Sequence, residues 1–514
     1  MTTELPWLGA ALAAGLFAQT LRLPVFVGFL LTGLLLGAAG QHPTELLLSA
    51  GHVGVLLLLF AVGLHLRPRN LLSQAVLVGG SLHLVISLLL FSTVSWLWGL
   101  TFSNAAIWGM LLSFSSTVLA AKTLEASGEL GAFHGRVTVG ILILQDIAAV
   151  AIMIVFTGTA PSLWALALLP GAAALHWLLP FVLARVQSDE LLLLLAVLLA
   201  LGIADVFNQL GLSAELGAIT AGALVAVHPR GDTLAERLWG IKELLLVGFF
   251  VGVGMRIAPS LADWAMAVGF ALLLPFKTWL FFALLVVLGL RARTAFLSGV
   301  SLTSYSEFTL IAGSIAQAQG LLPLAGLSVL TLAAVISFVL YLPLNRLNHA
   351  LYDRFQHLLA AFERDVPHPD DPVASIGAAR YLVLGMGRTG TAAYDFLVGT
   401  GENVAGLDVD PEILARHLRA HRRAAYGDAQ DSDLWRGLNL ASVRGAVVAL
   451  PHANERRRAT QLLRKAAPHL TISTYAMHAH ESEALAAAGA DHVSYLLAEA
   501  GERLAELSLE KSVH

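Results

Sequence analysis

The chain has 514 residues, of which 57% are hydrophobic and only 13% are charged. Together with a mean hydropathy of +0.74, this composition excludes an ordinary soluble globular protein, in which about a quarter of the residues carry charge. The sequence contains no cysteine, which excludes disulfides, thiolate metal sites and cysteine nucleophiles. The net charge of -4 averages an apolar part that extends to about Tyr352 and a charged part after it.

Up to Tyr352 the chain is a series of apolar runs, which predict thirteen membrane-spanning helices. The predicted spans run over residues 5–20, 23–39, 50–66, 72–98, 104–125, 132–157, 163–184, 190–207, 212–228, 234–255, 261–290, 294–319 and 324–351. Alternate connections hold most basic residues, namely Arg22, Arg67, Arg69, Lys122, Arg136, Arg185, Arg230, Arg237, Arg291, Arg293 and Arg346. Because basic loops stay in the cytoplasm, we expect the N-terminus outside and the part after Tyr352 in the cytoplasm. No basic region precedes the first apolar run, so we expect no cleaved signal peptide.

Two of these spans contain polar clusters that disfavour a continuous helix. The first cluster is Ser113–Thr117, in SFSST, and the second runs from Ser301 to Glu307, in SLTSYSE. Polar segments at corresponding places in two halves indicate inverted repeats with discontinuous helices that meet near the bilayer midplane. Unwound backbone is tolerated there because it is buried in protein. We therefore predict an all-α membrane domain in which two broken helices cross.

The span after the first cluster carries Gln145 and Asp146 between ILIL and IAAVAIMIV. A charged side chain at the centre of a membrane helix costs at least ~2.5 kcal/mol, so such residues mark ion or proton pathways by default. We interpret Asp146 as a carboxylate that binds a proton and a cation in turn. Gln145 and oxygens of Ser115, Ser116 and Thr117 are candidate neutral ligands for the cation. The alternative is a protonated aspartic acid that only hydrogen-bonds a neighbouring helix.

Two further charged residues lie inside predicted spans, namely Lys277 in LLLPFKTWLFF and Glu307 at the end of the second cluster. Where two broken helices cross, two positive N-terminal ends and two negative C-terminal ends are buried together. Glu307 and Lys277 are candidates to offset these partial charges. A plain Lys–Glu pair between helices is the alternative. In either case Asp146 remains the candidate carrier of the transported proton.

Residues 353–378 combine proline, aspartate and small residues, which predicts a linker between a membrane domain (residues 1–352) and a cytoplasmic domain (residues 379–514). In the latter, YLVL is followed by the glycines Gly385, Gly387 and Gly390, then by a helical pattern and a second strand that ends at Asp408.

This order of strand, glycines, helix and acid predicts a dinucleotide-type site. Backbone N–H groups would bind phosphate at the helix N-terminus, with Arg388 near the phosphates and Asp408 on the ribose. Further strand–helix alternation predicts a cytoplasmic α/β Rossmann-type domain, a doubly wound parallel sheet of about six strands. A Rossmann-type domain with an empty nucleotide site is the alternative.

SFSSTVLAAKTL followed by GRVTVGILILQDIAAV resembles the Kef-type branch of the monovalent cation:proton antiporter-2 family. SYSEFTLI and FVGVGMRI are similar to further segments of that family, and GMGRTG, GLDVDPE and YGDAQD resemble its regulator-of-potassium-conductance (RCK) domain. The resemblance implies a homodimer in the lipid of a bacterial inner membrane, with potassium and proton sharing Asp146. It implies AMP, or a dinucleotide such as NAD or NADH, at motifs that include Asp410, Asp428 and Ala429. It also implies regulation of some members by glutathione or an ancillary subunit.

Three features depart from the family's pattern. His65 stands where the family usually has an acidic residue, and Tyr475, Met477 and His478 stand in a segment that is commonly Ala-Arg-Ala-Arg. The sequence also ends at His514, soon after one Rossmann lobe. We therefore expect glutathione to be a weaker ligand than a nucleotide, because basic side chains suit its carboxylates.

These observations predict a secondary transporter rather than an enzyme, namely a potassium:proton antiporter that works by alternating access. With one titrating carboxylate, one cation exchanges for one proton and the exchange is electroneutral. A sodium:proton antiporter of the same fold is one alternative, because no motif reports selectivity. An RCK-gated potassium channel is another, although the sequence has no TVGYG-type filter. A membrane-anchored oxidoreductase would need a catalytic site beyond the Rossmann domain.

Overall fold

The computed structural model describes residues 4–21, 23, 25–64, 73–127, 129–157, 168–186, 188–210, 212, 214–226, 228, 231–363 and 376–510. Six residues named above lie outside this description, namely Arg22, His65, Arg67, Arg69, Arg230 and His514. The chain divides into two compact units. The first unit contains residues 1–120, 137–288 and 295–352, and the second contains residues 121–136, 289–294 and 353–514.

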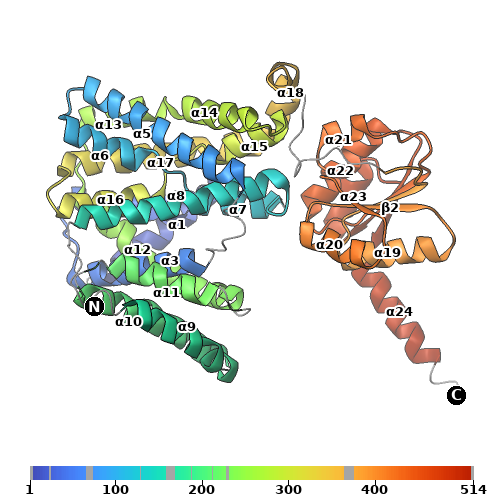
Figure 1. Cartoon of the computed structure of the whole chain (residues 1–514), viewed down its shortest axis with the longest axis horizontal. Helices are drawn as coiled ribbons and strands as arrows, with labels where there is room; N and C mark the ends of the chain where they lie inside the picture. The colour runs from blue at the N-terminus through green and yellow to red at the C-terminus, as the bar shows by residue number, and fades with distance from the viewer. Residues whose placement is uncertain are drawn as a thin grey trace. The chain divides into compact units, whose positions relative to one another are not determined.

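The described chain up to residue 360 is helical apart from its turns and connections (Figure 1). Apolar segments of this kind form helices because a helix satisfies its backbone N–H and C=O groups internally, as lipid requires. The helices are α1 (Glu4–Thr20), α2 (Val25–Ala38), α3 (Glu45–Leu64), η1 (Ala75–Gly79), α5 (Gly80–Leu97), α6 (Phe102–Leu112), α7 (Thr117–Ser127), α8 (Phe133–Thr157), α9 (Leu168–Arg185), α10 (Asp189–Gln209), α11 (Ala214–Ala226), α12 (Gly231–Arg256), α13 (Leu261–Ala271), α14 (Leu274–Val287), α15 (Ala292–Ser301), α16 (Glu307–Ala318), α17 (Leu324–Arg346) and α18 (Asn348–Ala360).

Eight segments of the described chain are long and apolar enough to cross a membrane. They cover residues 45–64, 75–97, 102–124, 133–156, 189–209, 233–256, 261–287 and 324–346. Helices α2 and α11 are apolar but shorter. The chain is a multi-pass membrane protein, and the predicted count of thirteen spans is not confirmed.

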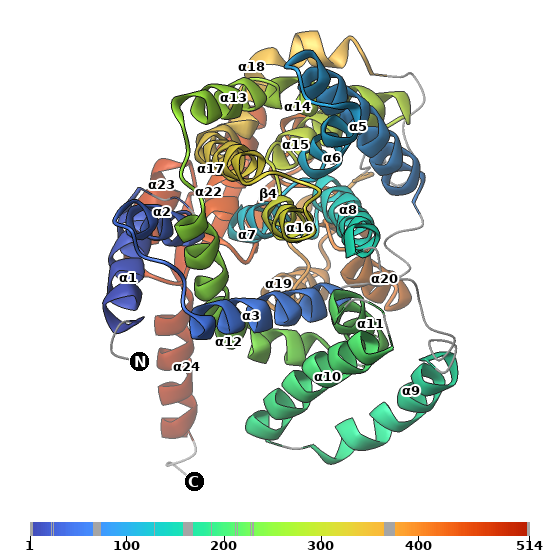
Figure 2. The ribbon, with the colours of Figure 1, turned by 90° about the vertical axis from the view of Figure 1, so that its left-hand side faces the viewer.

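The helices of the first unit pack in two groups. In one group α3 packs against α11 and α12, α12 packs against α2, and α10 packs against α11. In the other, α5 packs against α6, α13 packs against α17, and α16 packs against α6 and α17. Figure 2 shows α3, α10, α11 and α12 together, and α5, α6, α13 and α17 together. Small residues permit such packing: a Cβ atom on Gly222 of α11 would lie 2.1 Å from the Phe60 carbonyl oxygen of α3.

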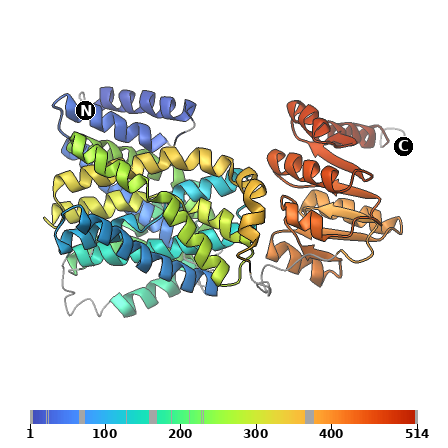
Figure 3. The ribbon, with the colours of Figure 1, turned by 90° about the horizontal axis from the view of Figure 1, so that it is seen from above.

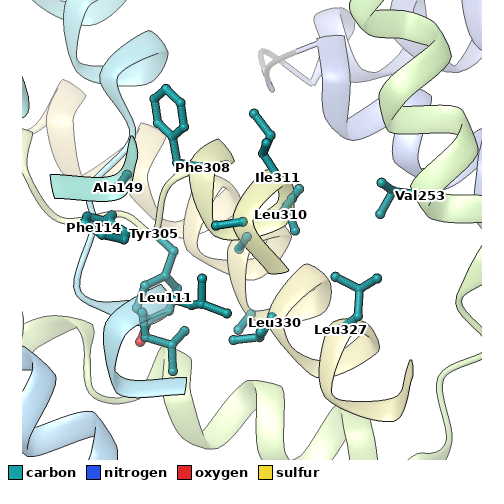
Figure 4. Close-up of a cluster of buried hydrophobic side chains, with 14 of the residues drawn as sticks. Leu111, Phe114, Ala149, Val253, Tyr305, Phe308, Leu310, Ile311, Leu327 and Leu330 are labelled. Atoms are coloured by element: carbon teal, nitrogen blue, oxygen red, sulfur yellow. The ribbon is translucent and has the colours of Figure 1, made fainter. Parts of the chain in front are cut away.

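A cluster of buried apolar side chains surrounds the end of α6 and the start of α16 (Figure 4). It includes Leu111, Phe114, Tyr305, Phe308 and Leu330, all of which are fully buried. Close packing of this kind leaves little room for movement. The polar backbone between these helices is therefore held in a rigid apolar frame.

Two of the predicted segments contain local structure that the sequence did not indicate. The run predicted over residues 261–290 forms one apolar span over residues 261–287, and a turn at Leu272 and Leu273 within it separates α13 from α14. Pro275 lies in the first turn of α14, where its missing N–H is not needed. The expected linker also begins as a helix, since α18 extends to Ala360 and residues 353–360 are helical.

The second unit contains six parallel strands in the order β3-β2-β1-β4-β5-β6, which confirms the predicted doubly wound sheet. Leu382 of β1 is in register with Ala405 of β2 and Ala446 of β4. Strand order therefore reverses beside β1, and ligands of open α/β sheets bind at such a switch point. In Figure 3 the orange first half of this domain and its red second half lie side by side.

The bounds of these elements are β1 (Tyr381–Leu384), α19 (Arg388–Gly399), β2 (Val404–Asp408), α20 (Pro411–Arg419), β3 (Ala424–Tyr426), α21 (Ser432–Gly437), β4 (Gly445–Val448), α22 (Ala453–Ala466), β5 (Thr471–Ala476), α23 (Ala479–Ala487), β6 (His492–Tyr495) and α24 (Leu496–Glu510).

Candidate functional site

Two helices of the first unit are interrupted where the sequence carries its polar clusters. The chain leaves helical conformation between α6 and α7 and again between α15 and α16. The two interruptions touch, since the Ser115 hydroxyl donates to the Leu302 carbonyl (2.9 Å) and the Ser116 N–H donates to Ser304 Oγ (3.3 Å). The Thr309 hydroxyl adds a bond to the Leu111 carbonyl (2.6 Å). Unwound backbone from two distant parts of the chain is therefore mutually satisfied here.

Lys277 lies at the C-terminal ends of α6 and α15, the helices that precede the two interruptions. Its ammonium donates to the carbonyls of Phe114 (2.6 Å) and Ser304 (2.9 Å), and the side chain is 0% exposed. These carbonyls follow α6 and α15, whose C-terminal ends carry partial negative charge. The buried cation offsets that charge and satisfies backbone groups left free by the breaks.

Glu307 lies at the N-terminal ends of α7 and α16, the helices that follow the two interruptions. It is the first residue of α16, and its carboxylate accepts from the Ser116 hydroxyl (2.7 Å) and the Val118 N–H of α7 (3.3 Å). The side chain is 3% exposed. Helix N-terminal ends carry partial positive charge and free N–H donors, so a buried anion is stabilised there.

Asp146 lies in the middle of α8 and is 2% exposed. The Thr117 hydroxyl, on the first residue of α7, is 3.0 and 3.1 Å from its two carboxyl oxygens. One hydroxyl proton occupies one of the roughly four acceptor positions of a carboxylate. The remaining acceptor positions can take a proton or ligate a cation.

Gln145 is turned toward the backbone of the first break. Its Oε1 accepts from the Ser115 N–H (2.8 Å), and its buried Nε2 has no hydrogen-bond partner among the described residues. Its oxygen is therefore already bonded to the unwound segment. The structure brings six of the predicted site residues to the two helix interruptions or to Asp146, namely Ser115, Ser116, Thr117, Gln145, Lys277 and Glu307.

Sequence reasoning missed several groups that fix this arrangement. The Tyr305 hydroxyl donates to the Phe270 carbonyl (2.7 Å), its N–H donates to Ser337 Oγ (3.0 Å), and its ring lies 5.3 Å from the Lys277 ammonium. Thr278 and Thr303 also bond each other. Tyr305 and Thr303 lie in the second polar cluster of the sequence, and this position marks them as candidate site residues. Ser337 lies in an apolar helix, and nothing in the sequence around it marks it as a candidate.

A second candidate site is a cavity of about 390 Å³ at the switch point of the sheet. Seven of the eight residues predicted for nucleotide binding line it, namely Gly385, Gly387, Arg388, Asp408, Asp410, Asp428 and Ala429. Gly385 has φ +88, which suits glycine in the tight turn. Gly390 lies underneath, because a Cβ atom there would be 1.8 Å from the Gly385 carbonyl oxygen. It permits α19 to pack against the turn.

The acidic residues of this cavity stabilise its loops. Asp408 accepts from the N–H groups of Met386 (2.6 Å) and Asp410 (2.9 Å), and burial raises its pKa. Glu455, in the first turn of α22, also lines the cavity and is 4% exposed. Burial, with the nearby charges of Asp428 and Glu129, raises the pKa of Glu455 to about 8. In the sequence, Glu455 is marked by nothing beyond its place in a charged helix.

Known proteins resemble this chain in both of its parts. A family model described as "Sodium/hydrogen exchanger, transmembrane" matches residues 8–345, and one described as "TrkA-N domain" matches residues 381–496. The glutathione-regulated potassium-efflux system protein KefC of Escherichia coli O157:H7 (strain EC4115 / EHEC) is 28% identical over 543 residues, covering 99% of this chain and 85% of that protein. The protein of the same name from Shigella flexneri is 28% identical over 505 residues, covering 92% of this chain and 79% of that protein.

Among solved structures, the TrkA-N domain of inner membrane protein ybaL from Escherichia coli aligns with 19% sequence identity and a TM-score of 0.23. The alignment covers 25% of this chain and 96% of that chain.

Proposed function

The chain belongs to the sodium/hydrogen exchanger family, and on that premise we propose that it is a potassium:proton antiporter of a bacterial inner membrane. The family consists of transporters, so the prediction of a secondary transporter rather than an enzyme is confirmed. The resemblance to Kef-type antiporters is also confirmed by the match to KefC. Potassium as the transported cation is supported by that relative, whose name describes a potassium-efflux system.

The buried carboxylate of Asp146 carries this proposal. It lies beside the unwound backbone at the two helix interruptions, and the Thr117 hydroxyl donates a hydrogen bond to it. An uncompensated buried charge is expensive, so the carboxylate is occupied either by a proton or by a potassium ion. Alternating access would present it to one side of the membrane at a time. Each cycle then exchanges one cation for one proton.

The neighbouring residues have supporting roles in this proposal. Lys277 and Glu307 hold the crossed helix ends, and Gln145 holds the Ser115 backbone. Hydroxyl and carbonyl oxygens near Ser115, Ser116 and Thr117 are the neutral ligands available to potassium, in addition to Asp146. Because Gln145 already accepts a backbone N–H, we assign it first to positioning.

We propose that a nucleotide regulates transport from the cavity of the second unit. Gly385 and Gly387 let backbone N–H groups approach a phosphate, Arg388 supplies a cation, and Asp408 and Asp410 suit ribose hydroxyls. AMP, NAD and NADH are the candidate ligands. Glutathione is the weaker one, because Tyr475 lines the cavity and bonds the Leu450 carbonyl instead of offering a basic group.

The arrangement in the membrane is also proposed. We propose that the membrane domain ends near residue 352, that a linker extends to residue 378, and that the cytoplasmic domain follows it. We place the N-terminus outside the cell and the C-terminal domain in the cytoplasm. We also propose that the chain acts as a homodimer. Since the sequence has no cysteine, single cysteines introduced at Thr2 and Ser508 can be labelled directly in intact cells and in opened cells. Labelling of the first from outside and of the second only after opening would support this orientation, and the reverse result would contradict it.

The experiment that tests the function is proton flux in proteoliposomes of the purified full-length protein. Potassium, sodium, rubidium and lithium gradients are imposed in turn, and internal pH is followed with a dye. Potassium-driven flux that saturates supports the proposal. Flux with sodium alone would support the sodium exchanger, and potassium conductance without proton counterflow would support a channel.

A further inference from the structure

Two short segments of the chain belong to the second unit although the residues on both sides of them belong to the first. They are residues 121–136 and 289–294. The first continues directly into α8, which carries Asp146, and the second continues into α15, which ends at the second break. Whatever holds these segments therefore holds the starts of two helices of the ion site by covalent continuity.

The segment 289–294 is held by buried ion pairs. Arg293 is 5% exposed, and its guanidinium contacts Asp428 (2.9 Å), Asp431 (3.4 Å) and the Gln430 carbonyl (3.2 Å). Arg291 contacts Asp431 as well (3.0 Å). Burial alone would raise the pKa of Asp431, but Arg293 and Arg291 lower it. The aspartate is therefore ionised in this network.

The aspartates belong to the loop that follows β3, and this loop is also a wall of the nucleotide cavity. Asp428 and Gln430 line the cavity, whereas Asp431 is not among its lining residues. The Gln430 N–H donates to Asp428 Oδ1 (2.9 Å), which makes the loop compact. A ligand that moves Asp428 or Gln430 must therefore shift the partners of Arg293.

The segment 121–136 contacts the same cavity from its other end. Gly131 and Ala132 line it. The Phe133 N–H donates to the Tyr426 hydroxyl (3.0 Å), and Arg136 donates to the Val409 carbonyl (3.0 Å). Both Tyr426 and Val409 lie at the carboxyl ends of strands that form the cavity. The two residues that immediately precede α8 therefore form part of the wall of the candidate ligand site.

We propose that Asp431, Arg291 and Arg293 couple occupancy of the nucleotide cavity to transport, by fixing the segments that begin α15 and α8. This rests on the proposed antiport and nucleotide site. A ligand can shift transport only by its differential affinity for two conformations. The ion-pair network supplies that difference, because breaking one partner of a buried pair leaves the other charge uncompensated.

The test uses the full-length protein and the substitution Asp431→Asn. Asparagine removes the charge that holds both arginines but keeps the cap of α21, since an oxygen can still accept the Asp433 N–H (2.8 Å) and asparagine is a good N-cap. AMP and NADH are the probes. Binding is measured by thermal stabilisation, transport by potassium-driven proton flux, and segment mobility by hydrogen exchange of residues 133–146 and 292–301.

We expect the Asp431→Asn variant to keep nucleotide-dependent thermal stabilisation and to keep potassium-driven proton flux in the absence of nucleotide. We expect nucleotide to change neither the flux nor the hydrogen exchange of this variant. Asp491→Asn is the matched control, because it removes the same charge from an ion pair of the second unit with Arg464 (2.6 Å) that touches neither segment. That control should respond to nucleotide as the wild type does. If Asp431→Asn does not fold, Arg291→Gln tests the same network at a more exposed side chain.

Three outcomes overturn the coupling. A variant that binds nucleotide and keeps the full wild-type response would do so, as would a wild type whose flux and hydrogen exchange ignore a bound nucleotide. Failure of AMP and NADH to bind the wild type removes the ligand on which the coupling depends. A wild type that shows nucleotide-dependent protection of residues 133–146 and 292–301 but no antiport would refute the proposed function and leave the mechanical coupling standing.

Discussion

Among the described residues, fewer protein groups form hydrogen bonds with the side chain of Asp146 than with those of Lys277 and Glu307. Lys277 donates to two carbonyls, and Glu307 accepts from a hydroxyl and an N–H. Asp146 has the Thr117 hydroxyl. A charge whose hydrogen bonds are provided by the fold is structural, whereas one with open acceptor positions can exchange partners.

Asp146→Asn should therefore abolish exchange and leave a folded protein, because asparagine keeps the shape and the bond to Thr117 but cannot take up a proton or balance a cation. Proton flux in proteoliposomes measures the loss, and size-exclusion chromatography reports the fold. Asp205→Asn, on an exposed part of α10, is the control and should transport normally. A wild-type rate from purified Asp146→Asn would show that another group carries the proton.

Glu455 predicts a pH dependence in the second unit. Its pKa in the folded protein is about 8, against an ordinary value of 4.5 for glutamate, so the folded state binds a proton that the unfolded state has released. The contribution of Glu455 to the free energy of unfolding is fully present below pH 4.5 and is lost as the pH rises to about 8. The free energy of unfolding falls over this range by at most about 1.4 kcal/mol per pH unit.

Glu455→Gln, which is permanently neutral, should gain stability relative to wild type as pH rises from 5 to 8, and the difference should then level off. Hydrogen exchange of β1 and β4 in the full-length protein measures it. Parallel wild-type and variant profiles over this range would contradict the assignment.

The glycines of the β1–α19 turn serve two different purposes. Gly387 lines the cavity, and a Cβ atom there meets nothing within 4 Å, whereas one on Gly390 would lie 1.8 Å from the Gly385 carbonyl oxygen. Gly387 therefore leaves space for a ligand, and Gly390 leaves space for the protein's own backbone.

Gly387→Val should fold but lose nucleotide-dependent stabilisation, which by linkage is about 2.7 kcal/mol at a ligand concentration one hundred times the dissociation constant. Gly390→Val should instead destabilise the domain with or without ligand. Thermal unfolding with and without AMP or NADH separates the two. Equal loss of stability in both variants without ligand would show that Gly387 also serves packing.

For the whole molecule, the open acceptor positions of one buried carboxylate, Asp146, predict electroneutral exchange. Gln145 adds no charge beside Asp146, so one cation and one proton replace each other at one site. Solid-supported-membrane recordings should show no transport current above that of empty liposomes, and a membrane potential should not change the flux. Currents comparable with those of an electrogenic exchanger at equal protein density would disprove this stoichiometry.

The sequence by itself determined the local features of this protein. Polar clusters in apolar spans located both helix breaks, and a strand, three glycines, a helix and a terminal acid located the sheet's switch point. Such signals survive in sequence because they depend on neighbouring residues and on backbone propensity. The turn at Leu272 and Leu273 inside the predicted run over residues 261–290 has no such signal, because apolar residues continue on both sides of it.

Only the tertiary structure decided which groups meet. Lys277 bonds Phe114 and Ser304, Thr117 bonds Asp146, and Arg293 bonds Asp428, although each pair is far apart in the chain. No periodicity links such residues, because the free energy that joins them comes from burying opposite charges and backbone dipoles together. The same reason explains why residues 121–136 and 289–294 belong to the second unit, although the sequence predicts them as short connections (residues 126–131 and 291–293) and the ends of the adjoining spans.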